Sequence, residues 1–198
     1  MQFFYARSTG GLYLDSVHGD SMPADCVPIS KDLHAELIHG EALGRKIVSG
    51  QNGVPYLTEL PPTALHKWAD GAWQLDLSSL HNQKRDEINL ACESAIKGGF
   101  WSAALGAPHQ YSSQLDDQLN LTGMILHGFD SLYACRNEQG VKAFRPHIFA
   151  QLRQVGDDFT VFKLQLLQKA NELKQRLDQA LADGDLTAIE SITWEDEQ

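Results

Sequence analysis

The stretch HIFAQLRQVGDDFTVFKLQLLQKANELKQRLDQALA, residues 147–182, decides the fold. Its apolar residues recur at intervals of three or four, which is the spacing of one helix face. They are Ile148, Leu152, Val155, Phe159, Phe162, Leu166, Ala170, Leu173, Leu177 and Leu181. At a rise of about 1.5 Å per residue, such a helix is roughly 54 Å long. Pro146 and Gly184 stand where a helix start and a helix stop are expected.

A helix of this length needs a surface that covers its apolar stripe from end to end. The rest of this chain, a second copy or a different protein can provide that surface. Leu164 and Leu167 widen the stripe beyond a strict two-position seam, which favours packing in a globular domain over a coiled coil. We therefore expect an α+β fold whose C-terminal domain is built on this one helix.

The composition is that of a chain with a buried core. Of the 198 residues 42% are hydrophobic, which argues against wholesale disorder. The net charge of -10 disfavours general electrostatic binding to nucleic acid or to an anionic membrane. The start, MQFFYARSTGG, lacks the basic and apolar segments of a signal peptide, and no run approaches about 18 apolar residues. We expect the protein to be cytoplasmic when it is made.

The first 62 residues predict a small ββαββ module. Strands at residues 2–7 and 12–14 flank a turn, and a turn-rich loop follows up to Ser30. Ser30 is a plausible N-cap for a short helix that ends near Gly40 to Gly44. A second hairpin brackets Asn52-Gly53, the strongest short turn signal in the chain, and Pro61-Pro62 closes the module.

Residues 63–83 form the next expected part, a tryptophan-containing hairpin and linker. Trp68 and Trp73 stand on either side of Asp70-Gly71. Two tryptophans beside a tight turn indicate either a local aromatic clasp or an adhesive surface. A polar helix from Leu80 to Lys97 follows and connects to the rest of the chain.

Residues 84–198 are expected to form the helical C-terminal domain. A hairpin or a broad turn is predicted around residues 106–108, and a further hairpin around residues 137–140. A helix from Ser113 lies between them, with an inner face predicted to carry Leu115, Leu119, Thr122 and Leu126. A short final helix is capped by Asp185.

Residue patterns for catalysis, for a cofactor and for a metal are absent from the sequence. His34 and His39 are five residues apart, not the four that place two imidazoles on one helix face beside a zinc ion. The adjacent carboxylates Asp116-Asp117 point about 100° apart on a helix and cannot share one substrate. Cys26, Cys92 and Cys135 form neither a disulfide framework nor a zinc pattern. We expect no enzymatic activity.

The opening module resembles phage tail fibre assembly proteins, the chaperones that help the trimeric fibres of phages and phage-tail-like bacteriocins to fold. The resemblance rests on FFYARSTGGLYLDSVHG, MPADCVPIS, EALGRKIV, GQNGVPYL, Pro61-Pro62 and KWADGAWQLD. The chain from about Lys84 to Trp194 is similar to a phage tail domain of unassigned role. That similarity rests on KRDEIN, on QLRQVGDDFTVFKLQLLQKANELKQ and on DLTAIESITW.

The resemblance implies a chaperone that binds the C-terminal tip of a tail fibre protein and assists its trimerisation in the cytoplasm of a bacterial host. The alternative is a structural part of the tail that stays on the virion as a fibre cap or receptor contact. The resemblance implies neither a cofactor nor a nucleic-acid or membrane partner, and leaves a homo-oligomer open. The side chains predicted to contact the partner are Tyr56, Leu57, Leu60, Trp68 and Trp73. Core packing is the alternative role for each of them.

Overall fold

A computed structural model describes residues 1–195, and the chain divides into two compact units. Unit 1 is Met1–Asp76, and unit 2 begins at Leu77. Both mix helices with small antiparallel sheets, so the predicted α+β class is confirmed. The finer division into residues 1–62, 63–83 and 84–198 stays a prediction.

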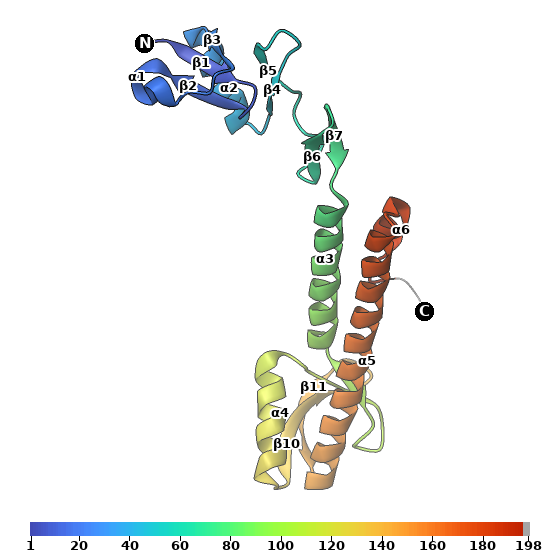
Figure 1. Ribbon diagram of the computed structural model, residues 1–198. Helices are drawn as coiled ribbons and strands as arrows, with labels where there is room; N and C mark the ends of the chain where they lie inside the picture. The colour runs from blue at the N-terminus through green and yellow to red at the C-terminus, as the bar shows by residue number, and fades with distance from the viewer. Residues whose placement is uncertain (196–198) are drawn as a thin grey trace. The chain divides into compact units, whose positions relative to one another are not determined.

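Unit 1 is built from three small sheets and one full helix (Figure 1). Its elements are β1 (Phe3–Ala6), β2 (Gly11–Leu14), α1 (Asp15–His18), a 3-10 turn (Gly19–Ser21), β3 (Cys26–Ile29), α2 (Lys31–Ala42), β4 (Ile47–Ser49), β5 (Pro55–Leu57), β6 (His66–Ala69) and β7 (Ala72–Leu75). The strand order of the largest sheet is β2-β1-β3. The core beside it consists of Tyr5, Ile29 and Leu37, with Leu57 packed against them.

The segment expected to be a loop between the first hairpin and α2 is more ordered than predicted. It contains α1, the 3-10 turn and β3, which pairs antiparallel with β1. Pro28 lies within β3, and a proline is tolerated there because β3 is at the edge of the sheet. Ser30 is confirmed as the N-cap of α2, since its Oγ accepts a hydrogen bond from Leu33 N at 3.0 Å.

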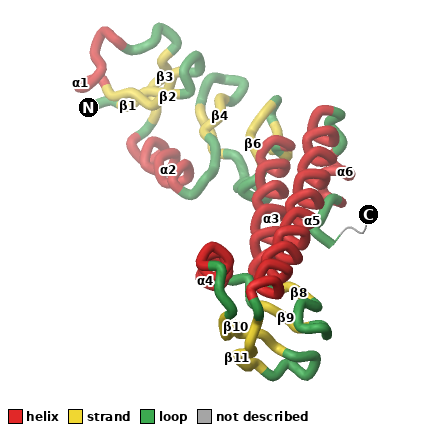
Figure 2. The backbone as a smooth tube through the Cα atoms, turned by 90° about the horizontal axis from the view of Figure 1, so that it is seen from below, coloured by secondary structure: helices red, strands yellow, loops and turns green. Residues whose placement is uncertain are grey.

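Unit 2 combines a four-stranded antiparallel sheet with three long helices (Figures 1 and 2). Its elements are α3 (Leu77–Lys97), β8 (Phe100–Ser102), β9 (His109–Tyr111), α4 (Leu115–His127), β10 (Ser131–Arg136), β11 (Lys142–His147), α5 (Phe149–Ala182) and α6 (Leu186–Ser191). The strand order is β11-β10-β9-β8. One face of the sheet carries the core of Phe100, Tyr111, Tyr133 and Cys135, which is covered by Leu121 of α4 and by Leu152 and Val155 of α5.

The long helix begins two residues later than predicted and ends where predicted. His147 closes β11, and Gln151 Oε1 accepts a hydrogen bond from Ile148 N at 3.0 Å as α5 starts. At the other end, Ala182 is the last helical residue, Asp183 is the C-cap, and Gly184 comes next with φ +67°. Its left-handed conformation suits glycine and stops the helix.

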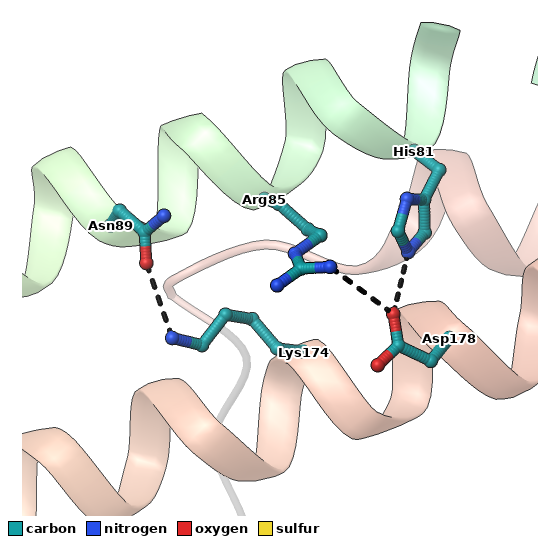
Figure 3. Close-up of polar contacts among 5 residues, drawn as sticks. All are labelled: His81, Arg85, Asn89, Lys174 and Asp178. Carbon is teal, nitrogen blue, oxygen red and sulfur yellow. Dashed lines mark hydrogen bonds and ion pairs between the residues drawn. The ribbon is translucent and has the colours of Figure 1, made fainter. Parts of the chain in front are cut away.

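The second half of α5 packs antiparallel against α3, and α6 closes the open end of this helix pair. His81, near the start of α3, contacts Asp178, near the end of α5, while Cys92 Sγ lies 3.6 Å from Leu166 O. Figure 3 shows the polar contacts along this seam. Lys84 Nζ donates to Glu190 O at 2.8 Å and so ties α3 to α6. Ile189 and Ile192 are buried at this end.

The prediction of which face of α4 points toward the core is wrong. Leu115, Leu119 and Leu126 are exposed, whereas Leu121 is buried and Ile125 packs against the core. The helix carries two apolar stripes of similar length, and the sheet covers the one that local spacing did not favour.

Two helical glycines provide a matched test of packing. A Cβ on Gly40 of α2 would lie 2.3 Å from Leu57 Cδ1, whereas one on Gly123 of α4 meets nothing within 4 Å. We expect G40A to lower the free energy of unfolding of unit 1 by about 1 kcal/mol. The cost of overpacking, about 1–3 kcal/mol, should exceed the gain of about 1 kcal/mol in helix propensity. G123A should raise the stability of unit 2 by about 0.5–1 kcal/mol. Hydrogen exchange in urea, resolved by unit, measures both; a stabilising G40A would contradict this packing.

Candidate interaction surfaces

Of the five side chains predicted to contact a partner, two are more than half exposed. Tyr56 is 51% exposed and points outward from β5, while its neighbours in that strand do not. Leu60 is 55% exposed in the segment after β5. Leu57 points the other way and packs on the core of unit 1 against α2. The structure therefore gives Leu57 a packing role and leaves Tyr56 and Leu60 available to a partner.

Trp68 and Trp73 contact each other. They are directly opposite in the β6–β7 hairpin, with ring centroids 5.4 Å apart and the planes at 77°. Trp73 Nε1 also donates a hydrogen bond to Glu59 O at 3.0 Å, which ties the hairpin to the preceding segment. Both rings are half-buried, so this pair has the geometry of the aromatic clasp. Whether its outer edges also bind a partner stays a prediction.

The β4–β5 hairpin has the free edges that a partner strand needs. Its two strands pair with each other, and within the described residues neither pairs with a third strand. The base is closed by Thr58, which is buried and exchanges hydrogen bonds with Lys46: Thr58 N donates to Lys46 O, and Lys46 N donates to Thr58 Oγ1, each at 2.9 Å. An exposed strand edge on a fixed hairpin can accept an added strand.

Unit 2 has a groove between α4 and α5 with a mixed lining. Its apolar side chains are Leu121, Ile125, Leu126, Phe159, Leu164 and Leu167, and its polar ones are Gln118, Thr122, Asp157, Thr160 and Lys163. Gly156 lets the helices approach closely there, because a Cβ on Gly156 would lie 2.5 Å from Ile125 Cδ1. Leu164 and Leu167 of α5 are exposed, so the apolar stripe of α5 is wider than the surface that this unit covers. Such a groove between helices is a common kind of docking surface.

A buried polar cluster beneath the sheet was not predicted from the sequence. His147 Nδ1 lies 2.8 Å from Arg145 O, which can only accept, so Nδ1 carries the proton. Nε2 of the neutral imidazole then accepts from the hydroxyl of Tyr111, also at 2.8 Å. The two partners are 36 residues apart in the chain, and no local motif joins them.

The electrostatics of this cluster suit a structural role. Burial lowers the pKa of His147, raises that of the Cys135 thiol and raises that of Tyr133 to about 12. These groups are therefore uncharged near neutral pH and offer neither a thiolate nor a charged base. Within residues 1–195, no three His, Cys, Asp or Glu side chains are placed to share a metal ion.

Among the helices of residues 1–195, none combines the length and the apolar content that crossing a bilayer requires.

The fold and these surfaces define an α+β protein with exposed apolar side chains on both units. Residues 79–193, more than half of the chain, match the family described as "Domain of unknown function (DUF4376)". The chain belongs to this family. It is also similar to a probable tail fiber assembly protein of Shigella phage SfV, with 36% identity over 61 residues.

The match to the phage protein is partial. It covers 31% of this chain and 36% of that protein, so the chain spans about a third of the relative's length. No solved structure matches the chain. The resemblance found in the residues is confirmed at this level: a domain of unassigned role in the C-terminal part, and similarity to a tail fibre assembly protein.

His147 makes the stability of unit 2 depend on pH. Its pKa is lowered in the folded chain, so on acidification the unfolded chain binds a proton first. Stability is therefore greatest above the ordinary histidine pKa of 6.5 and falls as the pH drops through 6.5 toward the folded pKa. Urea midpoints between about pH 7.5 and pH 5.5 measure this slope. H147Q should flatten it, while H127Q, at an exposed site, should not; equal slopes in all three proteins would refute the assignment.

Proposed function

We propose that this protein binds a phage tail fibre protein and assists its folding and trimerisation. The observation that carries the proposal is the similarity to a probable tail fiber assembly protein. The exposed Tyr56 and Leu60, and the free edges of the β4–β5 hairpin, support it because they suit contact with another protein. We propose that the protein assists the folding of the fibre in the cytoplasm of a bacterial host.

The physical task of such a protein follows from the nature of a trimeric fibre. Until three chains are in register, each exposes apolar strands and unpaired backbone edges, which associate wrongly. A protein that pairs with an edge and covers apolar side chains lowers the concentration of such exposed states. In this scheme the β4–β5 hairpin of unit 1 pairs with the C-terminal tip of the fibre chain. Tyr56 and Leu60 supply apolar contact, and the edges of Trp68 and Trp73 add to it.

Co-expression with a fibre protein tests the proposal. The fibre encoded beside this protein is produced with and without it, and the yield of soluble, heat-resistant trimer is measured. We expect trimer to depend on the protein. Equal yield in both cultures would refute the chaperone role, and so would a failure of the two proteins to co-purify at any stage.

Side-chain changes test the proposed contact surface separately. The double variant Y56S/L60S should weaken fibre binding about ten- to a hundred-fold, because losing two apolar contacts costs about 1–3 kcal/mol. The control is I38S, at an exposed position of α2 in the same unit, which should leave binding unchanged. An equal effect of both variants would place the contact elsewhere while leaving the chaperone role intact.

The second candidate is a structural component that remains on the particle as a fibre cap or receptor contact. The tight pairing of Trp68 with Trp73 suits a long-lived part as well as a transient helper. Mass spectrometry of purified particles separates the two. A transient chaperone should be absent from mature particles, whereas a cap should be present in a fixed ratio to the fibre.

A further inference from the structure

The sheet of unit 2 has an uncovered face. Side chains alternate along its strands, so one set points at α4 and α5 and the other points away. We call the second set the outer sheet face and define it by Trp101, Leu132, Arg136, Lys142, Phe144 and Pro146. Phe144 is 71% exposed, Leu132 60% and Trp101 53%. In Figure 1, α4 and the first turns of α5 flank β10 and β11.

Apolar side chains of this size seldom gather on a face that stays in water. Leu132 is directly opposite Pro146 on β11, and Phe144 is two residues from Pro146 in the same strand. These three side chains therefore occupy adjoining positions. Trp101 lies on the same face at β8, with Gln110 of β9 and Arg136 of β10 between it and β11. A contiguous exposed patch of this kind marks a surface that binds another protein.

The charge of the outer sheet face differs from that of the chain. Arg136 and Lys142 are directly opposite each other, and Phe144 is two residues after Lys142 on the same face of the sheet. The other outward positions of the four strands are Gln110 and Ala134, so these strands carry two cations and no carboxylate on this side. Glu138 lies beyond them in the connecting turn. In a chain of net charge -10, a cationic apolar face is a local reversal of sign.

A cleft beside the two cations extends the same surface. β9 and β10 pair only at Gln110 and Arg136, and the strands separate beyond that point. The gap is a cleft of about 190 Å³, and Lys97, Gln110, Arg136 and Lys142 are among its lining residues. Asp117 lies on its wall, where its carboxylate accepts a hydrogen bond from Ser112. Lys97 is already paired with Glu93, which leaves Arg136 and Lys142 as the cations that can meet a carboxylate of an occupant.

We propose that the outer sheet face docks a segment of another protein in which apolar side chains are bordered by carboxylates. The apolar part covers Phe144, Leu132 and Trp101, and the carboxylates lie by Arg136 and Lys142. A second copy fits less well, because face-to-face pairing would bring the cations of both copies into one interface without a carboxylate to pair with them. The inference concerns unit 2 and is independent of the fibre binding proposed for unit 1.

Three synthetic amphipathic peptides test this docking surface on the full-length protein. They share the same Leu and Phe positions and carry Glu, Gln or Lys at every other position. Fluorescence anisotropy should rank their affinities as Glu above Gln above Lys, with the differences shrinking as salt is added. Backbone amide shifts should map the bound Glu peptide to β8, β10 and β11. Equal affinities, no saturable binding of the Glu peptide, or shifts confined to α3 would each overturn the proposal.

Matched variants show whether the named side chains are responsible. F144S removes an exposed ring and should weaken binding of the Glu peptide about tenfold or more, as expected for a central contact. K142E should lower affinity for the Glu peptide and raise it for the Lys peptide. The controls L119S and K163E change an exposed Leu of α4 and a cation of α5, and should leave both affinities unchanged.

The oligomeric state tests whether a second copy of this chain occupies the outer sheet face. Sedimentation of the wild type over a range of concentrations should show the same species as F144S. A concentration-dependent dimer that F144S abolishes would show that a second copy occupies this face, and would overturn the proposal.

Discussion

Burial of the apolar stripe of α5 is the constraint on which unit 2 depends. The helix runs from Phe149 to Ala182, and the core under the sheet reaches only its first half. Its first half lies under the sheet beside α4, where Leu152 and Val155 are fully buried. Its second half packs on α3 and α6, where Leu177 is fully buried. At about 1.5–3 kcal/mol for each buried side chain of this size, both halves contribute.

The same constraint explains why unit 2 keeps apolar surface in water. Two antiparallel helices cover only one stripe of each other, so Leu90 of α3 and Leu164 of α5 remain exposed. One layer of helices likewise covers only one face of a sheet, which leaves Phe144 and Leu132 outside. The exposed apolar surfaces therefore follow from the architecture, and they are available to bind a partner.

The elements with strong local signals could be predicted from the sequence. The three-to-four spacing of α5 and the turn at Gly140 are local, and the structure has the helix and the hairpin there. The N-cap of α2 is local as well, because Ser30 needs only Leu33 to make its bond. β3 was missed because its four residues include Pro28 and follow a run of turn-forming residues, and its pairing with β1 is not local.

The surfaces were harder to predict because tertiary contacts decide them. α4 offers two apolar stripes, and only the sheet determines which is buried. Residue type alone does not separate Tyr56 from Leu57, because strand alternation decides that Tyr56 is exposed and Leu57 is packed. The bond between Tyr111 and His147 joins residues 36 apart, so no motif could reveal it.

Hydrogen exchange of the isolated full-length chain tests most directly whether α5 is covered by this chain itself. The central claim is that α3 and α6 bury the second half of the helix without a partner. Amides around Leu173 and Leu177 should then exchange as slowly as those around Leu152 and Val155. Fast exchange in the second half, with slow exchange in the first, would contradict the claim and would mean that a partner must complete the fold.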